Sequence, residues 1–272
     1  MSGIARVLIV AGSDSGGGAG IQSDIKTVTM LGGHAMTAIT AVTAQNTLGV
    51  EAVYRMEPEA IVRQMSCVAE DIGVDAVKIG MLGSAAIADA IADELRTDLY
   101  GTAIVLDPVM IASSGAVLAD ERTVAAMERL ARMSAVVTPN LPELAVLCGR
   151  ERLDPAEVED AARDLAARFG TSLLVKGGHA EGATVVDRLI DADGVVARWA
   201  NPRIDTRHSH GTGCTLSSGI ATGLAAGLPL THAIGRAIDY VRASLAAAPG
   251  LGSGHGPMGH ALGQVTFDRC RG

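Results

Sequence analysis

The sequence predicts one α/β domain of three layers, in which helices cover both faces of a mainly parallel sheet. Short apolar runs alternate with longer amphipathic stretches along the 272 residues, and this alternation is typical of parallel strands joined by crossover helices. Glycines or polar residues follow several apolar runs, which places ligand-binding groups at the carboxyl ends of the strands. We find no repeat and no long linker, so we expect a single domain over residues 1–272.

The composition excludes several classes of protein. The formal net charge is −8, and there is no run of Lys and Arg that would bind nucleic acid. Aromatic residues make up 2% of the chain, too few for a base-stacking platform. The four cysteines lack Cys-x-x-Cys spacing, which argues against a zinc or redox motif. The apolar run near the N-terminus is too short for a signal peptide or a membrane span. We therefore expect a cytoplasmic protein without nucleic-acid or membrane partners.

Unbroken apolar runs predict strands that are buried on both faces. We expect an edge strand at residues 50–56, and the alternation at residues 183–200 predicts two antiparallel strands with a turn at Asp193 and Gly194. The predicted strands cover residues 6–11, 34–43, 50–56, 75–79, 103–109, 135–138, 172–176 and the pair at 183–200.

Helical stretches separate most of these strands. Pro58 and Pro142 each stand in the first turn of a predicted helix, where proline is well tolerated. We expect a mobile loop at residues 111–119 and a surface loop at residues 249–263, in which His255 and His260 are loop residues rather than metal ligands. The predicted helices cover residues 21–31, 58–72, 85–96, 120–131, 155–169, 214–227 and 229–247, with one more beginning at Pro142.

A glycine-rich segment at residues 12–20 joins the first strand to the first helix. It lacks the lysine of a Walker A loop, and its glycine spacing does not fit the GxGxxG fingerprint of dinucleotide-binding proteins. We therefore reject an NAD-dependent enzyme. Asp24 and Lys26 lie on the first turns of the helix that follows, and the sequence leaves open whether they are functional or form a solvated face.

The segment at residues 210–214, His-Gly-Thr-Gly-Cys, precedes a helix of small residues. Its two glycines allow a tight turn and a close approach to a ligand, and the free N–H groups of the first helical turn favour an anion. A thiol at a helix N-terminus titrates below its usual pKa, so Cys214 is a candidate acid or base. The alternative is a glycine turn before a buried helix with a buried Cys214.

Two groups after the early strands are candidates for contact with a small molecule. The Gln45 amide offers a donor and an acceptor to a heterocycle, although residues 45–46 are also compatible with a plain turn. Met81 after the strand at residues 75–79 either lines a pocket or fills the core.

Charged and polar groups follow the later strands. Asp107 ends a buried strand, where a carboxylate is poorly explained by packing. Asn140 and Glu143 are expected to face the same crevice and to hold Mg²⁺ with its waters, unless Asn140 only caps the helix. Lys176 beside two glycines predicts a phosphate contact.

Seven stretches in this order resemble hydroxymethylpyrimidine/phosphomethylpyrimidine kinases of thiamine biosynthesis, which belong to the ribokinase-like superfamily. Together they span nearly the whole chain. The stretches are AGSDSGGGAGIQSDIKT (residues 11–27), TAQNTLGV (43–50), KIGML (78–82), LDPVM (106–110), TPNLPE (138–143), VKGGH (175–179) and HGTGCTLSSGIA (210–221).

The resemblance implies a ribokinase-like fold, a homodimer, and transfer of the γ-phosphoryl group of ATP to 4-amino-5-hydroxymethyl-2-methylpyrimidine, then to the resulting monophosphate. It implies that Gln45 binds the pyrimidine edge in a pocket lined by Gly12, Ala19, Asp24, Met81 and Val109. Gly211, Thr212, Gly213 and Cys214 would form the anion hole, with Cys214 where many relatives carry a catalytic aspartate. Asp107, Asn140 and Glu143 would serve Mg²⁺, and Lys176 would contact the transferred or β-phosphate.

The chain departs from the family pattern at residues 113–116, where Ser-Ser-Gly-Ala replaces a loop that often carries a lysine and an acid. Two other functions remain open at this point. A pyridoxal or pyridoxine kinase would use the same framework on a similar hydroxymethyl heterocycle, although Gln45 and Met81 favour the pyrimidine. A non-catalytic sensor would keep the fold, but Asp107, Lys176 and Cys214 argue against a pure binder.

Overall fold

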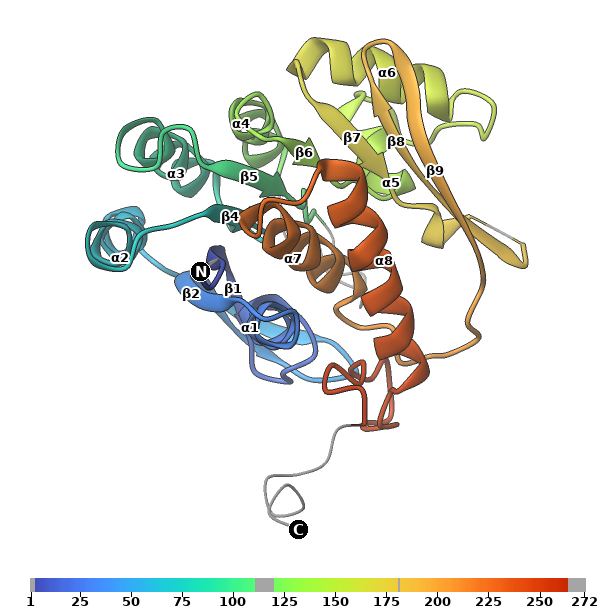
Figure 1. Ribbon diagram of the computed structural model, residues 1–272, viewed down its shortest axis with the longest axis horizontal. Helices are drawn as coiled ribbons and strands as arrows, with labels where there is room; N and C mark the ends of the chain where they lie inside the picture. The colour runs from blue at the N-terminus through green and yellow to red at the C-terminus, as the bar shows by residue number, and fades with distance from the viewer. Residues whose placement is uncertain (1–2, 111–119, 181, 264–272) are drawn as a thin grey trace.

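A single sheet with strand order β3-β2-β1-β4-β5-β6-β7-β8-β9 runs through the computed structural model, which describes residues 3–110, 120–180 and 182–263 (Figure 1). The six central strands, β2, β1, β4, β5, β6 and β7, pair in parallel. At the edges, β3 pairs antiparallel with β2, and β8 and β9 form an antiparallel pair beside β7. The strands are β1 (Arg6–Asp14), β2 (His34–Gln45), β3 (Val50–Arg55), β4 (Ala76–Ile79), β5 (Ala103–Leu106), β6 (Val136–Val137), β7 (Ser172–Val175), β8 (Thr184–Asp191) and β9 (Gly194–Pro202).

Helices cover both faces of the sheet, as the sequence predicts. One face carries α1, α7 and α8, and the other carries α2 to α6 (Figure 1). In the described part of the chain, no helix is long and apolar enough to cross a membrane. The helices are α1 (Gly20–Met30), α2 (Pro58–Asp71), α3 (Ala85–Thr97), α4 (Glu121–Ala131), α5 (Leu141–Leu147), α6 (Val158–Phe169), α7 (Thr212–Ala225) and α8 (Leu230–Ala246), with a short 3₁₀ turn at Gly177–His179.

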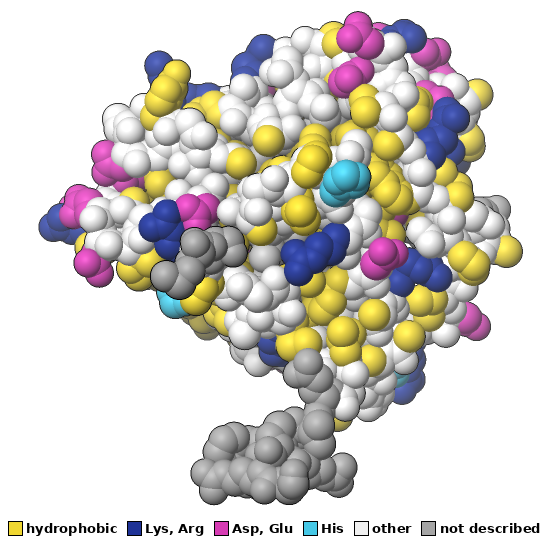
Figure 2. Space-filling view, in the orientation of Figure 1, with side chains coloured by type: hydrophobic (Ala, Val, Ile, Leu, Met, Phe, Trp, Pro, Cys, Tyr) yellow, Lys and Arg dark blue, Asp and Glu magenta, His cyan; other side chains and the backbone are white. Residues whose placement is uncertain are grey.

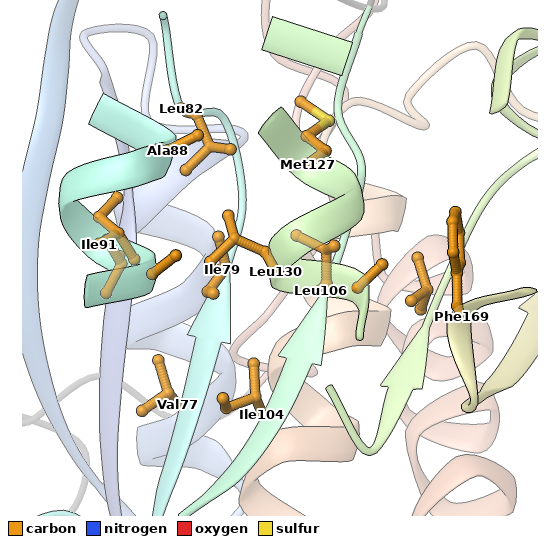
Figure 3. Close-up of a cluster of buried hydrophobic side chains, with 14 of the residues drawn as sticks. Val77, Ile79, Leu82, Ala88, Ile91, Ile104, Leu106, Met127, Leu130 and Phe169 are labelled. Atoms are coloured by element: carbon orange, nitrogen blue, oxygen red, sulfur yellow. The ribbon is translucent and has the colours of Figure 1, made fainter. Parts of the chain in front are cut away.

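Two hydrophobic cores form because side chains alternate between the faces of each strand. Val77 and Ile79 of β4 pack with Ile104 and Leu106 of β5 against α3 and α4, in the core that Figure 3 shows. Val105 points the opposite way, into the second core beneath α1, α7 and α8. The same alternation turns the polar residues that directly follow β5, β6 and β7 toward the face that carries α7.

The strand order reverses between β1 and β4. The chain leaves β1 for β2 on one side and later returns to β4 on the other side. In open α/β sheets, ligands bind outside the carboxyl ends of the strands at such a reversal. The glycine-rich segment after β1 and the Gly80-Met81 turn after β4 both lie at this edge.

The predicted α/β class and every predicted element inside the described residues are confirmed, and the differences lie at element ends. β1 continues to Asp14 because its last residues still pair with β2. α7 begins at Thr212, two residues earlier than expected, since Gly211 has a φ of 88° and ends the preceding loop. The loop predicted at residues 111–119, including the departure at 113–116, lies outside the described residues.

Charged side chains are mixed on the face that carries α7 and α8. Figure 2 shows Lys and Arg scattered among Asp and Glu, with hydrophobic side chains between them, rather than gathered into a basic stripe. This distribution agrees with the formal net charge of −8, and on this face it offers no footprint for a nucleic-acid backbone.

Candidate active site

Three polar residues reach one point because they occupy equivalent positions just beyond neighbouring strands. Asp107, Thr138 and Lys176 follow β5, β6 and β7 directly, and alternation turns all three toward the face that α7 covers. Lys176 Nζ lies 2.8 Å from Asp107 Oδ1, and the Thr138 hydroxyl donates to the same oxygen at 3.1 Å. The sheet therefore presents a carboxylate and an ammonium beneath the start of α7.

A cavity of about 640 Å³ lies at this edge of the sheet. It extends from the glycine-rich segment after β1, past the start of α7, to the wall formed by β8, β9 and α8. Its lining includes every predicted site residue except Asp24, namely Gly12, Ala19, Gln45, Met81, Asp107, Val109, Asn140, Glu143, Lys176, Gly211, Thr212, Gly213 and Cys214.

The N-terminus of α7 is built for close approach. Gly211 caps the helix with a φ of 88°, and a Cβ atom there would lie 2.0 Å from the carbonyl oxygen of Gly18. A Cβ on Gly213 would lie 3.3 Å from Asp107 Oδ2 and 3.4 Å from Lys176 Nζ. The first helical turn directs N–H groups outward, so its glycines leave room for an anion between the backbone and Lys176.

Lys176 lies between two carboxylates. Its Nζ is 2.8 Å from Asp107 Oδ1 and 3.6 Å from Glu143 Oε2, and its side chain is 14% exposed. Burial lowers the pKa of Lys176, but the two carboxylates outweigh burial and raise it above its usual value. Burial and the charge of Asp107 raise the pKa of Glu143 to about 6, although Lys176 opposes the shift. The lysine is therefore charged and has more negative partners than it neutralises.

Asn140 caps α5, as one of the two interpretations of the sequence proposed. Its side-chain oxygen accepts from the Glu143 N–H at 2.8 Å, and the Glu143 carboxylate accepts from the Asn140 N–H at 2.8 Å. This capping box fixes the Glu143 side chain beside Lys176. Asn140 thus acts on the site by holding Glu143.

The donor set fits a magnesium ion that brings its own ligands. Within the described residues, no group of three or more His, Cys, Asp and Glu side chains could hold a metal. Asp107 and Glu143 supply two carboxylates, and Mg²⁺ in kinases is usually held by one or two carboxylates together with phosphate oxygens and water. The residues present are sufficient for a metal that arrives with a phosphorylated substrate.

The pKa expected for Cys214 is wrong. The side chain lies in the first turn of α7 and is half-buried against the cavity. Burial raises the pKa of the thiol to about 11, and the opposing effect of the nearby Lys78 ammonium is smaller. Cys214 is therefore a thiol at neutral pH, and the cost of burying a thiolate explains why the helix N-terminus does not lower its pKa.

Asp24 does not line the cavity, and it is not on a solvated face. Its carboxylate is fully buried beneath α7, where it accepts from Lys78 Nζ at 2.8 Å and from the Ser218 hydroxyl at 2.6 Å. Lys78 is also fully buried. Burial lowers the pKa of Lys78, but Asp24 and other negative groups raise it above its usual value. The pair joins α1, β4 and α7, so Asp24 acts on the site from below rather than as a wall.

One end of the cavity lies next to β1 and β2 and is lined by Gly12, Gln45 and Met81. A Cβ on Gly12 would lie 2.3 Å from Met81 Cε, so the glycine makes room for the methionine. Gln45 at the end of β2 lies 3.1 Å from the Nε2 atom of His210, and that atom is 3.0 Å from Asp14 Oδ2. This end of the cavity, which we call the slot, combines apolar contact from Met81 with the Gln45 amide, and such a lining suits a polar heterocycle.

Several residues of the site were not predicted from sequence. Asp14 organises the glycine-rich segment by accepting from the backbone N–H groups of Gly16, Gly18 and Ala19. An aspartate two residues before a run of glycines is a recognisable signal for such a turn. His210 and Lys78 stood inside quoted stretches but were assigned no role. The wall of β8, β9 and α8, which includes Asp187, Asn201 and Arg242, carries no local signal.

The chain is similar to known kinases along most of its length. The family described as phosphomethylpyrimidine kinase matches residues 14–259. The hydroxymethylpyrimidine/phosphomethylpyrimidine kinase of Haemophilus influenzae is 42% identical over 264 residues, covering 96% of this chain and 98% of that protein. The thiamine biosynthesis bifunctional protein ThiED of Geobacter sulfurreducens is 47% identical, and the match covers 94% of this chain but 52% of that protein. The chain thus spans about half the length of the bifunctional relative.

Two solved structures share the fold. The ADP complex of Bacillus subtilis pyridoxal kinase has a TM-score of 0.87 at 30% identity and covers 96% of this chain and 98% of its own. The phosphomethylpyrimidine kinase of Clostridium difficile has a TM-score of 0.74 at 36% identity and covers 88% of this chain and 98% of its own. The pyridoxal kinase thus has the higher TM-score, and the phosphomethylpyrimidine kinase has the higher sequence identity.

Proposed function

The chain is a kinase of the phosphomethylpyrimidine kinase family, and from that premise we propose that it phosphorylates a hydroxymethylpyrimidine twice. The γ-phosphoryl group of one ATP passes to the hydroxymethyl oxygen of 4-amino-5-hydroxymethyl-2-methylpyrimidine. A second ATP then phosphorylates the monophosphate to the diphosphate, for thiamine diphosphate biosynthesis. The carrying observation is that one cavity joins the slot of Gln45 and Met81 to the start of α7 and to Lys176.

The pyrimidine occupies the slot. Gln45 binds the ring edge, while Gly12, Ala19, Met81 and Val109 line the slot around the ring. This places the hydroxymethyl group toward Cys214 and the start of α7. Holding the acceptor oxygen near the donor phosphate contributes much of the catalysis in phosphoryl transfer, because little covalent chemistry is left for the protein.

The phosphates occupy the space between α7 and Lys176. Backbone N–H groups of Gly213 and Cys214 serve the charge that develops on the transferred group, whereas the Thr212 N–H already donates to the Ser209 carbonyl oxygen at 3.3 Å. Each donor aimed at such a charge is typically worth a factor of about 10²–10³ in rate. Lys176 supplies a positive charge from the side of the cavity formed by the strand ends. The adenosine end of ATP lies along the wall of β8, β9 and α8, which forms the remaining length of the cavity.

Asp107 and Glu143 would hold Mg²⁺ with its waters, and Asn140 fixes Glu143 through the capping box. When bound, the ion supplies positive charge that neutralises the phosphate oxygens. Asp107 also holds the Lys176 ammonium at 2.8 Å, so one carboxylate would position both the lysine and the ion. Glu143, with its pKa raised to about 6, is ionised at neutral pH and available to the ion.

Cys214 acts as the base of the first step. It stands in the first turn of α7 and lines the cavity that joins Gln45 and Met81 to Lys176. Because its pKa is raised to about 11, few molecules carry the thiolate at pH 7, but the thiolate that forms is a strong base for an alcohol proton. The second step needs no base of this strength, since a phosphate oxygen is already ionised.

A pyridoxal kinase is the second candidate, and one observation favours it. The fold superimposes with a higher TM-score on the pyridoxal kinase of Bacillus subtilis than on the phosphomethylpyrimidine kinase of Clostridium difficile. Against it stand the higher sequence identities to pyrimidine kinases and the match to their family over residues 14–259.

We further propose a homodimer in the cytoplasm, built of one kinase domain per chain. The resemblance to the family motivates the dimer. The thinly distributed cysteines and the acidic composition support a reducing compartment. Sedimentation of the purified protein would give the oligomeric state directly.

A product assay tests the proposed function. The enzyme is incubated with ATP and Mg²⁺ and offered the hydroxymethylpyrimidine or pyridoxal in separate reactions, and mono- and diphosphates are resolved by chromatography. We expect pyrimidine monophosphate followed by diphosphate. Monophosphate alone would remove the second step, pyridoxal phosphate alone would establish the second candidate, and no product from either would indicate a sensor.

A further inference from the structure

Gln45 lies between a threonine on its own strand and a histidine from the loop before α7. Gln45 Oε1 is 3.2 Å from Thr43 Oγ1, and Gln45 Nε2 is 3.1 Å from His210 Nε2. The two ends of a carboxamide have nearly the same shape, so a half-turn of the group exchanges oxygen and nitrogen without any change in packing. The hydrogen-bonding needs of Thr43 and His210 therefore decide which end faces which neighbour.

His210 needs an acceptor from Gln45. Its Nε2 atom lies 3.0 Å from Asp14 Oδ2. Asp14 is buried and ionised: burial raises its pKa, but the bonds from His210 and from backbone N–H groups outweigh burial and hold the pKa below its usual value. A carboxylate only accepts, so Nε2 of His210 carries a proton whichever group faces the other ring nitrogen. This single N–H lies between Asp14 Oδ2 and the Gln45 amide and is shared by the two as a three-centre hydrogen bond. An amide nitrogen 3.1 Å from Nε2 would oppose one donor with another.

Thr43 needs a donor from Gln45. Its hydroxyl has one proton and two acceptors in reach, the Ser13 carbonyl oxygen at 3.0 Å and Gln45 Oε1 at 3.2 Å, and we assign the proton to the nearer one. The remaining lone pairs of Oγ1 face Gln45 at 3.2 Å. Because Thr43 is buried, an oxygen facing an oxygen there would leave both without a proton between them. The shorter contact of Thr43 with Ser13 thus favours the same orientation of the Gln45 amide as His210 does.

We propose that Asp14, acting through His210, and Ser13, acting through Thr43, turn the Gln45 amide so that Oε1 accepts from His210 and Nε2 donates to Thr43, and that this orientation selects the substrate edge. The proposal rests on the proposed function in placing the substrate ring at Gln45. Asp14, Thr43 and His210 are then positioning residues, and Gln45 is the group that touches the substrate.

The orientation leaves a defined pattern for the ligand. One N–H and one oxygen lone pair of Gln45 remain along the edge that lines the cavity. Their complement is a ring nitrogen that accepts beside an exocyclic amino group that donates, which is the same pairing by which glutamine recognises adenine. An aminopyrimidine has this edge, with its amino group on the His210 side and its ring nitrogen on the Thr43 side. Pyridoxal has no amino group to place there.

Nuclear magnetic resonance on the unliganded enzyme tests the orientation directly. We expect nuclear Overhauser effects from the side-chain NH₂ of Gln45 to protons of Thr43, and a protonated Nε2 on His210 between pH 7 and 8. Overhauser effects from the Gln45 NH₂ to the His210 ring, or an unprotonated Nε2, would overturn the proposal. Neither signal depends on turnover, substrate or Mg²⁺.

A matched pair of variants tests the link to specificity. Thr43→Val removes the acceptor for Gln45 Nε2, while Thr43→Ser keeps it. We expect Thr43→Val to raise KM for the pyrimidine about 5- to 10-fold, as for the loss of one buried hydrogen bond, with kcat changed by less than about twofold. Thr43→Ser should stay near wild type, and thermal unfolding should show both variants folded. Equal KM values in the two variants would contradict the proposal.

A second pair addresses His210. His210→Phe removes the donor to Gln45, and His210→Gln restores an N–H that can reach Asp14. We expect the preference for pyrimidine over pyridoxal, measured as the ratio of the two kcat/KM values, to fall in His210→Phe and to recover in part in His210→Gln. An unchanged ratio in folded His210→Phe would overturn the specificity role. If wild-type enzyme phosphorylates no pyrimidine while the Overhauser effects are as expected, the proposed function fails and the amide orientation stands.

Discussion

Two lysines on the same face of the sheet make the same bond in opposite surroundings. Lys78 and Lys176 each lie 2.8 Å from a carboxylate oxygen, of Asp24 and Asp107 respectively. The Lys78 pair is sealed, with both side chains 0% exposed, whereas Lys176 is 14% exposed and borders the cavity. The distance within a pair therefore does not reveal its role. The sealed pair of Lys78 and Asp24 holds the fold together, whereas the open pair of Lys176 and Asp107 can contact a ligand.

The surroundings also differ in balance. The Ser218 hydroxyl satisfies the second oxygen of Asp24, so the sealed pair has its partners inside the protein. Around Lys176, two carboxylates face one ammonium, and burial with the charge of Asp107 raises the pKa of Glu143 to about 6. Asp107, Glu143 and Lys176 thus carry an excess of negative charge that a bound cation would neutralise. Such an excess is expected of a site that takes Mg²⁺ with a nucleotide.

Breaking the sealed pair should have the largest effect on stability. Lys78→Met leaves the Asp24 charge buried without its partner, and Asp24→Asn does the same to Lys78. We expect each to lower the free energy of unfolding by about 3–5 kcal/mol, and the double variant to lose less than the sum of the two, measured by denaturant unfolding. Single variants within about 1 kcal/mol of wild type would show that the pair does not hold the fold.

Breaking the open pair should act on turnover instead. Lys176→Met removes the positive charge opposite α7, and we expect kcat to fall by about 10²–10³. The free energy of unfolding should change less than in Lys78→Met, because the carboxylates left behind border a cavity that water can enter. Steady-state assays and denaturant unfolding on the same preparation give both numbers. A stability loss equal to that of Lys78→Met would remove the distinction between the two pairs.

Cys214→Ala should separate the two chemical steps. The first step removes a proton from an alcohol, while in the second a phosphate oxygen attacks, so we expect the first rate to fall more than the second. Single-turnover assays that start from the pyrimidine and from its monophosphate compare them. Equal losses in both steps would sink the assignment of Cys214 as base.

The pH profile gives a smaller but more specific signal. With its pKa raised to about 11 by burial, the fraction of Cys214 in the thiolate form increases with pH below that value. We expect kcat of the first step to rise between pH 7 and 9 in the wild type and to stay flat in Cys214→Ala. A wild-type profile that is already level from pH 7 would mean that the thiol titrates much lower or takes no proton.

The open pair could be predicted from sequence, and the sealed pair could not. Asp107 and Lys176 end apolar strands, and parallel strands bring such ends to one edge. Lys78 stands inside the apolar β4, and its partners Asp24 and Ser218 come from two helices far away in the chain. No local pattern records a contact of that kind. For the same reason, Asp24 was expected at the substrate or on a solvated face.

Burial set the other limit on prediction. The position of Cys214 in the first turn of a helix was read correctly, but its pKa depends on how deeply α7 is packed, which the pentapeptide does not contain. Gln45 and His210 are in contact although 165 residues separate them in the chain. No local sequence pattern therefore predicts that the slot around Gln45 adjoins the start of α7.

Gly213→Ala tests most directly whether phosphoryl transfer takes place between α7 and Lys176. The added Cβ would lie 3.3 Å from Asp107 Oδ2 and 3.4 Å from Lys176 Nζ, inside the proposed phosphate space. Gly178→Ala is the matched control, because Gly178 also lines the cavity and a Cβ there would meet nothing within 4 Å. We predict that kcat for pyrimidine phosphorylation falls by at least about tenfold in Gly213→Ala and stays near wild type in Gly178→Ala, with both variants folded. A folded Gly213→Ala enzyme with wild-type kcat would contradict the account.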